Sequence, residues 1–586
     1  TFSKFFNIPI TPLHIYGKIK IYHVYGVIVM VHIQYKTFGQ LTLSDYEVFS
    51  SVPPHPFWSR VEQVVDFSFA DKLCAPLYSH NGQRPYAPSL KLKIHFAQRY
   101  HNYSDREMEE AILYHLHLKR FLGVPVAFNG FDHSTLGLDR NRMGSDLFDA
   151  CHHHILSQAM AKGLWGKEND RWLIDSFHTY ANIAKVGAYR LIQQGILQII
   201  QHIKRTYPKL YTFLLQDCDL KGFLKRLSDR TPEKDRLVLF SRLVVEAYSL
   251  LHWLESERVQ PLFWTWEKAK PQLRCLELQA ILYQILQENT KPVGPNKPEG
   301  AKQEPIQYQE LSKKEKPQDR IRSAYDPEIR SGYKSKSLKF TGDKIQVLES
   351  REHGLILNTE PIPGNEWDGD RLVPMVKEVI DRHGIVPKQL IGDTAYGTGE
   401  NRQKITEMQI LLAAPIQKNS NSTGLLEHDW FVYDAKLDEV TCPQGYSTSK
   451  KVRNNPNQGY QFKFEPQTCQ ACPQFEQCTT NKKGRTVFIS DFYEIMEQGK
   501  SYNQTEAGKS ALKARYDVER TNNELANHHG LRTPRTSGRE SLRITSKLTA
   551  MVINMKIMVK KLAEPIKPFY RYKKYENRVK APVCPN

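Results

Sequence analysis

The fold is decided by Gln389-Leu390-Ile391-Gly392-Asp393, a short apolar run that ends in a carboxylate. Its length and its lack of polar alternation predict a buried strand. The next residues, Thr394-Ala395-Tyr396-Gly397, predict a loop that leads into a helix. An upstream segment, Arg171-Trp172-Leu173-Ile174-Asp175, has the same pattern of an apolar strand that ends in Asp. Because strand ends meet at one edge of an α/β sheet, Asp175 and Asp393 can converge.

Elements on either side of these strands predict a mixed sheet flanked by helices. Residues 344–349 and 354–359 indicate two strands joined by a hairpin loop. Residues 368–383 carry an apolar stripe with helical spacing, and residues 410–414 indicate one more buried strand. The fold class is therefore α/β, with a helical insertion between the first strand and the rest of the sheet.

Length and charge limit the function classes. The chain has 586 residues, which predicts two or three domains or one domain with large insertions. Lys and Arg number 82 against 63 Asp and Glu, a net charge of +19 that favours a polyanionic partner such as nucleic acid. The longest apolar run near the start is far shorter than a membrane span, so no membrane association is expected. Nine cysteines without a recognisable signal peptide indicate a reducing cytoplasm.

The N-terminal region is predicted to be all helical over residues 41–165. Ser104 and Glu107 have the spacing of a capping box, and a second helix is expected to start near Asp132. Two short helices around Gly123 fit a helix-turn-helix DNA-binding module, and a plain helical bundle fits as well. Residues 1–40 are interpreted as a non-native or disordered extension, with Met30 as the true start.

The remaining chain divides by composition. The predicted order is the first catalytic strand at 166–184, a helical insertion at 185–290, a basic linker at 291–338, the catalytic core continued at 339–424, a cysteine-containing β-rich insertion at 425–495, C-terminal catalytic helices at 496–565 and a basic tail at 566–586.

The β-rich insertion holds four of the nine cysteines. Cys469 and Cys472 have the spacing of a metal knuckle, and Cys442 and Cys478 would complete a tetrahedral zinc site. The alternative is that all four are reduced thiols, since the spacing from Cys442 to Cys469 is long.

Glu519 lies on a predicted helix over residues 511–528. With Asp175 and Asp393 it would provide three carboxylates, the ligand type that Mg²⁺ and Mn²⁺ prefer. Two such ions can activate an attacking oxygen and stabilise the leaving oxygen of a phosphodiester. Taken singly, each residue has an ordinary alternative: a turn or cap for either Asp, and a solvated pair with Arg515 for Glu519.

Four segments, 171–182, 339–370, 392–402 and 515–556, resemble the DDE transposases of bacterial insertion sequences. The likeness rests on the strand that ends in Asp175, on the motif Gly392-Asp393-Thr394-Ala395-Tyr396-Gly397, and on the spacing of Arg515 and Glu519. Residues 85–136 are similar to the DNA-binding region of that family. The resemblance implies a ribonuclease-H-like catalytic fold behind an all-α N-terminal DNA-binding domain.

The same resemblance implies the function. Asp175, Asp393 and Glu519 would hold Mg²⁺ or Mn²⁺, and the protein would bind double-stranded DNA at the terminal inverted repeats of its element, cleave it and join it to target DNA. A dimer is expected in the synaptic complex, in a bacterial, nucleoid-associated cytoplasmic location. The alternatives are a catalytically decayed DNA-binding protein and a metal-dependent nuclease without strand transfer.

Basic residues near the last motif are expected to contact phosphates. A solvated basic face is the alternative. The DNA-binding residues predicted are Arg515, Arg532, Arg535, Arg539 and Lys344, with Arg520, Arg543, Lys547, His528 and His529 nearby.

Several positions depart from the family pattern. Ala526 stands where some members have Lys or Arg. Asp343 stands where the family usually has Tyr, and Gln346 and Trp367 each stand where it commonly has His. Trp367 and Tyr396 are expected to be packed in the core rather than to stack on a displaced base.

Overall fold

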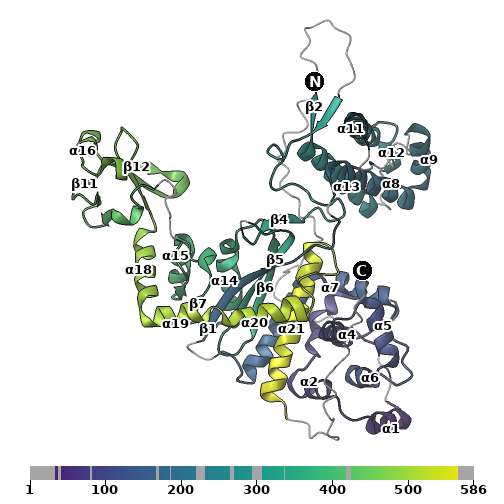
Figure 1. Ribbon diagram of the computed structural model, residues 1–586. Coiled ribbons are helices and arrows are strands. Elements are labelled where there is room, and N and C mark those ends of the chain that lie inside the picture. Colours follow the sequence, from purple (N-terminus) through teal and green to yellow (C-terminus); the bar gives the residue numbers. More distant parts are fainter. Residues whose placement is uncertain are drawn as a thin grey trace, which may run out of the picture.

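The computed structural model describes residues 33–36, 38, 41–79, 82–166, 170–184, 186–218, 227, 231–263, 269–293, 307–335, 337–417 and 424–564. Its described part is mixed α/β, with a central sheet from which a helical insertion and a small β-rich subdomain extend in different directions (Figure 1). Most of the expected extension at 1–40, including Met30, and the whole basic tail at 566–586 lie outside the described residues.

The N-terminal region is helical, as predicted. Its helices are α1 (Leu43–Ser51), α2 (Trp58–Val64), α3 (Phe69–Leu73), α4 (Pro88–His101), α5 (Asp105–Tyr114), α6 (Leu116–Leu122) and α7 (His133–Ala161), with a 3₁₀ turn at Ala75–Leu77. The capping box is confirmed, because Ser104 and Glu107 bond each other's backbone amides at the start of α5. Asp132 caps α7, as expected, and the helix is interrupted at Gly144, where φ is +67°. Residues 33–36 of the expected extension reach this region, where Lys36 forms a β-bridge with Tyr86.

The central sheet has six strands. They are β1 (Arg171–His178), β4 (Arg330–Tyr333), β5 (Lys339–Ser350), β6 (Ile356–Pro363), β7 (Gln389–Ile391) and β8 (Leu411–Ala413). The path β4-β5-β1-β7-β8 runs across the sheet, and β6 pairs with β5. Strand β1 is antiparallel to β5 and parallel to β7, so β1 and β7 end at the same edge.

Helices cover both faces of this sheet. On one face, Trp172 and Ile174 of β1 pack with α7, α14 (Leu372–His383) and α21 (Arg539–Leu562) in one large core. On the other face, Leu173 packs against Ala511, Ala514 and Val518 of the C-terminal helices. The alternation of side chains along β1 therefore feeds two separate cores, as a strand in the middle of a layered sheet requires.

The segment predicted to be one helix over residues 511–528 is broken into three pieces. These are α19 (Glu506–Ala514), α20 (Asp517–Asn523) and a π-helical turn at Glu524–His528. One face of these pieces is buried, with Ala514, Val518, Thr521 and Leu525 on it. On both sides of the breaks, the buried side chains pack against strands of the sheet.

The helical insertion has a core of its own. It contains α8 (Ala188–Thr206), α9 (Pro208–Asp217), α11 (Glu233–Glu255), α12 (Gln260–Phe263), α13 (Ala269–Asn289), β2 (Thr290–Val293) and β3 (Gln307–Glu310). Helix α8 packs so closely on α13 that a Cβ at Gly195 would lie 2.9 Å from a methyl group of Leu282. Among the described helices, α11 alone is long and apolar enough to cross a membrane, and its buried side chains pack within this core.

The basic linker expected at 291–338 is wrong over its described residues. Strand β3 pairs with β2, and β4 pairs with β5 at the edge of the central sheet. Ile321 and Ala324 are buried in the core of the insertion. The charged and proline-rich composition of the segment suggested a linker and gave no sign of these two short strands.

The β-rich subdomain stands apart from the sheet at the end of α18 (Tyr493–Gln504), at the left of Figure 1. Two three-stranded sheets form it, β9 (Val432–Asp434) with β10 (Glu439–Thr441) and β11 (Ser447–Thr448), and β12 (Lys451–Asn454) with β13 (Gly459–Lys463) and β14 (Thr486–Ser490). Two short helices, α16 (Pro466–Gln470) and α17 (Phe475–Cys478), carry three of its cysteines on or next to them.

Candidate active site

Asp175 lies within β1 and does not end it. The strand continues to His178, because the polar residues after Ile174 still pair with β5, Asp175 opposite Val347 and Ser176 opposite Gln346. Burial raises the pKa of Asp175 from 3.8 to about 6, and the carboxylates of Asp393 and Asp368 add to this rise. An acid whose charge is destabilised by like charges is a common property of a cation site.

Asp393 follows β7 by two residues and is half exposed. Its Oδ1 accepts the backbone N–H of Thr394 at 2.6 Å, which fixes the turn into the 3₁₀ helix Thr394–Tyr396. The guanidinium of Arg515 donates to the same oxygen at 2.5 Å. The motif that follows β7 therefore presents a carboxylate at the edge of the sheet next to β1.

The end of α19 and helix α20 each contact one of the aspartates. Arg515, just before the helix, pairs with Asp393, and Asn522 donates from its Nδ2 to Oδ2 of Asp175 at 2.9 Å. Within α20, Glu519 lies three residues before Asn522, a spacing that puts the two on neighbouring sides of the helix. Glu519 is exposed and borders the buried face formed by Val518 and Thr521.

Asp175 and Asp393 therefore lie near each other at one edge of the sheet, and within the described residues no hydrogen bond or ion pair joins Glu519 to either of them. In the described chain, groups of three metal-ligand atoms within 4.8 Å of one another occur at two other places. At the predicted site, Arg515 provides the positive charge next to Asp393.

Sequence reasoning missed Asp368, which contributes a fourth carboxylate near Asp175. Asp368 begins the 3₁₀ turn Asp368–Arg371 that precedes α14, and Ser176 of β1 donates to its Oδ2 at 3.2 Å. Lys344 pairs with its Oδ1 at 2.7 Å, and Gln346 donates to its backbone carbonyl at 2.7 Å. The signal in the sequence was the acidic motif Trp367-Asp368-Gly369-Asp370 directly after a strand and before a helix.

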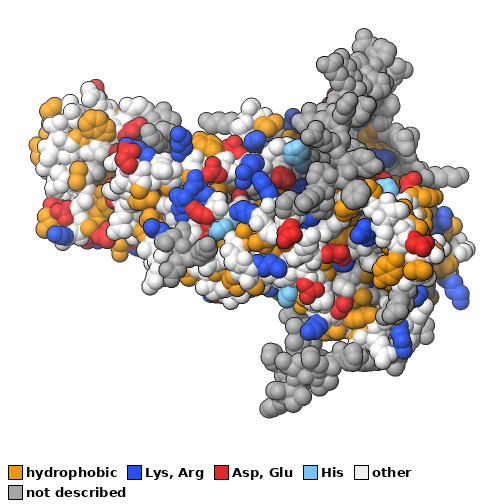
Figure 2. Space-filling view, turned by 90° about the horizontal axis from the view of Figure 1, so that it is seen from below, with side chains coloured by type: hydrophobic (Ala, Val, Ile, Leu, Met, Phe, Trp, Pro, Cys, Tyr) orange, Lys and Arg blue, Asp and Glu red, His pale blue; other side chains and the backbone are white. Residues whose placement is uncertain are grey.

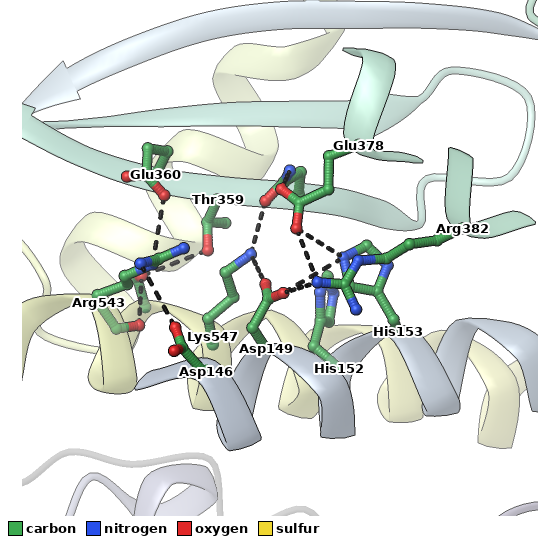
Figure 3. A network of polar contacts seen from close by, with 12 residues as sticks. Asp146, Asp149, His152, His153, Thr359, Glu360, Glu378, Arg382, Arg543 and Lys547 are labelled. Atoms are coloured by element: carbon green, nitrogen blue, oxygen red, sulfur yellow. Dashed lines mark hydrogen bonds and ion pairs between the residues drawn. The ribbon is translucent and has the colours of Figure 1, made fainter. Parts of the chain in front are cut away.

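Of the two tight clusters, Asp149, His153 and Glu378 lie between α7 and α14 (Figure 3). The ring Nε2 of His153 is 3.8 Å from an oxygen of each carboxylate. Two cations already neutralise the group, because Lys547 pairs with Asp149 and Arg382 donates to Asp149 at 2.9 Å and to Glu378 at 3.0 Å. We interpret this cluster as a buried ion network that joins the N-terminal region to α14 and α21, and not as a metal centre.

The other tight cluster, Glu109, Asp132 and His133, stabilises the start of α7. Glu109 accepts the backbone N–H of His133 at 3.1 Å and contacts its ring Nδ1 at 2.9 Å. These contacts tie α5 to α7 within the N-terminal helices.

The basic residues expected to bind DNA are mostly engaged with the protein. Arg532 donates to the carbonyl of His178 at 2.6 Å, and Arg539 pairs with Asp343 at 3.3 Å. Arg535 is the most exposed of the five predicted, with 56% of its side chain accessible and a contact of 3.3 Å to Glu107. Figure 2 shows Lys and Arg side chains gathered on one face but interspersed with Asp and Glu.

Two neighbouring basic residues are ruled out as phosphate contacts. Lys547 is fully buried, and its ammonium donates to Asn358 at 2.6 Å as well as pairing with Asp149. His529 is also buried. Their expected place in a surface track was wrong, because the helix face that carries them packs against the protein.

Trp367 and Tyr396 differ in exposure. Tyr396 is buried, as expected, and burial raises the pKa of its phenol well above the usual value. Trp367 is 51% exposed, which contradicts the expectation that it is packed. It lines a cavity of about 520 Å³ together with Asp370, Lys404, Gln458 and Phe492, between the central sheet and the β-rich subdomain.

The other departures from the family pattern are explained locally. Ala526 is fully buried in the π-helical turn, where a Lys or Arg would not fit. Asp343 pairs with Arg539, and burial raises its pKa to about 6.

The four predicted zinc ligands, Cys442, Cys469, Cys472 and Cys478, line a single cavity in the β-rich subdomain. All four are free thiols of intermediate exposure.

Comparisons with known proteins agree with this picture. Residues 46–142 match a family described as Transposase domain (DUF772), and residues 441–559 match a family described as Transposase DDE domain. No curated protein and no solved structure was found to match. The first match covers most of the N-terminal helices, and the second includes Glu519, α20 and most of α21. Together the two matches support an insertion-sequence transposase of the DDE type.

Proposed function

We propose that this transposase binds the ends of its insertion sequence and catalyses metal-dependent cleavage and strand transfer with Asp175, Asp393 and Glu519. The observation that carries the proposal is that the segment holding Glu519 contacts both aspartates, through residues on either side of it. Arg515, at the end of α19, contacts Asp393, and Asn522 of α20 contacts Asp175. Glu519 lies between these two residues in the sequence, which supports its assignment as the third carboxylate.

The sheet supports a ribonuclease-H-like fold for the catalytic region. Three antiparallel strands, β6, β5 and β1, are followed by β7 and β8, which run parallel to β1. Asp175 on the central strand and Asp393 after its parallel neighbour then fall where strand ends meet, a common place for ligand sites in open sheets.

The donor set fits Mg²⁺ or Mn²⁺. Carboxylate oxygens are the ligands that these hard cations prefer, and Asp175, Asp393 and Glu519 would hold them. Burial is the main cause of the raised pKa of Asp175, the carboxylates of Asp393 and Asp368 add to the rise, and Arg515 opposes it. When bound, divalent cations supply Lewis-acid stabilisation of the charge that develops on phosphodiester oxygens.

The chain's own residues prepare the reaction. In the first step a water oxygen forms a bond to phosphorus as the P–O3′ bond breaks; the attacking water gives a proton to solvent, and the leaving O3′ takes one from solvent to become the 3′-hydroxyl of the element. In the second step that hydroxyl attacks a target phosphodiester in the same way. Asn522 holds the orientation of Asp175, and Thr394 holds that of Asp393.

DNA contacts are assigned to exposed groups around this edge. Arg535 and Trp367 are accessible, and the cavity that Trp367 lines lies next to the turn that carries Asp368. The N-terminal helices are proposed to bind the terminal repeats. A dimer is proposed for the synaptic complex, because two element ends must be held together.

The test uses a labelled duplex made from the DNA that flanks the gene, with and without Mg²⁺ or Mn²⁺. Wild type is compared with Asp393→Asn and Glu519→Gln, and the exposed Asp381→Asn serves as a matched control. We expect wild type and the control to cut at a defined end and to join it to target DNA. Both site variants should bind the duplex without cutting it.

Other outcomes separate the alternatives. Cleavage without joining would favour a nuclease without strand transfer, and binding without any cleavage by folded wild type would favour a decayed copy. A fully active Asp393→Asn protein would refute the assignment of the site.

A further inference from the structure

The four cysteines of the β-rich subdomain come from separate parts of the chain and meet at one cavity. Cys442 follows β10, Cys469 lies in α16, Cys472 follows that helix and Cys478 ends α17. Three phenylalanines, at positions 431, 464 and 475, share the lining of the cavity with them. The loop after β10 and the segment of α16 and α17 therefore fold toward the same cavity.

The local backbone at these thiols is that of tight turns. The N–H of Cys472 donates to the carbonyl of Cys469 at 3.1 Å, and the N–H of Gly445 donates to the carbonyl of Cys442 at 2.9 Å. Gly445 has a φ of +83°, a backbone conformation that residues other than glycine rarely adopt. Each turn thus presents a cysteine from a sharply bent loop.

The subdomain has little else to hold it together. Its buried core consists of six side chains, Phe431, Val440, Phe462, Phe464, Val487 and Ile489, separate from the cores of the sheet. A unit of this size rarely has enough apolar surface to be stable, and small domains commonly add disulfides or a metal. None of the four thiols forms a disulfide.

We propose that Cys442, Cys469, Cys472 and Cys478 bind a structural zinc ion that holds the β-rich subdomain together. Four thiolates are a donor set that selects zinc, and a closed four-ligand site is structural rather than catalytic. The sulfur atoms are not among the groups of three ligand atoms within 4.8 Å found in the described chain. Zinc binding therefore draws the two turns together and closes the cavity.

One cation, Arg485, lies at the cavity that the four cysteines line. Arg485 donates to the carbonyl of Cys478 at 2.7 Å and stacks over Phe431 with its guanidinium carbon 5.1 Å from the ring centroid. A bound zinc ion would ionise the thiols that coordinate it.

The experiment measures zinc in the full-length protein purified without chelators from zinc-supplemented cells. Wild type should contain about one zinc per chain by elemental analysis. The double variant Cys469→Ser/Cys472→Ser should lose it. Cys218→Ser, a half-buried cysteine of the helical insertion, is the matched control and should keep it.

A second measurement avoids variants that fail to fold. Wild type stripped of zinc and reloaded with Co²⁺ should show thiolate-to-cobalt charge-transfer absorption in the near ultraviolet. Reactive thiols should rise by four when zinc is chelated. Zinc-free wild type, a double variant that keeps its zinc, or cobalt spectra without thiolate bands would each overturn the proposal. None of these readouts depends on DNA cleavage.

Discussion

Asp175→Asn should stabilise the protein while it abolishes cleavage. The side chain is largely buried on β1 beside Asp393 and Asp368, and its pKa is raised from 3.8 to about 6. The folded state therefore binds the proton more tightly than the unfolded state does. Stability is highest below the unfolded pKa and falls as the pH rises from about 3.8 to 6, where Asp175 becomes charged in the fold.

The size of the effect follows from the same values. The difference between 3.8 and about 6, at about 1.36 kcal/mol for each pH unit, gives about 3 kcal/mol above pH 6. The substituted amide removes this charge and keeps an oxygen that can accept from Nδ2 of Asn522. We expect Asp175→Asn to raise the free energy of unfolding of the sheet by up to about 3 kcal/mol near pH 8, and to change it little below pH 4.

Urea titration with hydrogen–deuterium pulse labelling of the β1 peptide measures this at both pH values in the presence of a chelator. The exposed Asp381→Asn is the control, with an expected change within about 0.5 kcal/mol. Saturating Mg²⁺ should stabilise wild type and not the variant. A variant that is less stable than wild type near pH 8 without metal would refute the argument, because the carboxylate would then be stabilising.

Three further outcomes follow from other contacts. Lys547→Met leaves buried Asp149 without its closest cation and should lower stability by about 3 to 5 kcal/mol in urea unfolding, a loss that Asp149→Leu in the same chain should partly restore. Arg515→Gln removes the cation that would compete with a metal ion for Asp393. Because exposed ion pairs contribute about 0.2 to 1 kcal/mol, the variant should bind Mn²⁺ up to about fivefold more tightly than wild type in calorimetry without DNA. Weaker binding by the variant would count against this competition. Trp367→Ala should leave the thermal midpoint unchanged, because the ring is half exposed, and should weaken binding of a nicked or single-stranded end by about 1 to 3 kcal/mol in fluorescence anisotropy; unchanged affinity would exclude stacking.

Local patterns with strong physical causes were predictable from the sequence. The capping box at Ser104 forms because its two polar side chains satisfy amides that a helix start leaves free. Leu372, Met375, Val376 and Val379 are buried on α14, since their spacing forms one stripe that must face a core. The β5–β6 hairpin and strand β8 were predictable for the same reason, because local patterns of apolar residues and a short loop mark them in the sequence.

Other features depend on tertiary context. The strand at Asp175 was expected to end because a carboxylate follows three apolar residues, but pairing with β5 carries β1 three residues further. Lys547 was assigned to a surface track because charge in a sequence does not reveal its partner, and here the partner is a buried aspartate from α7. Asp368 was missed because the contact with Ser176 joins residues distant in the sequence.

The entry and exit of the helical insertion lie side by side on the sheet. After β1 and β5 pair up to His178 and Lys344, the bonds continue from the amide of Thr179 to the carbonyl of Asp343 at 2.8 Å and from that of Ala181 to Thr341 at 3.0 Å. During synthesis, β1 is made first, and its partner β5 follows about 160 residues later. An insertion that folds on its own core and returns the chain to its starting point replaces a long flexible loop, so it lowers the entropic cost of forming this pair. Extra residues can therefore be inserted between β1 and β5 without changing the order in which the strands of the sheet pair.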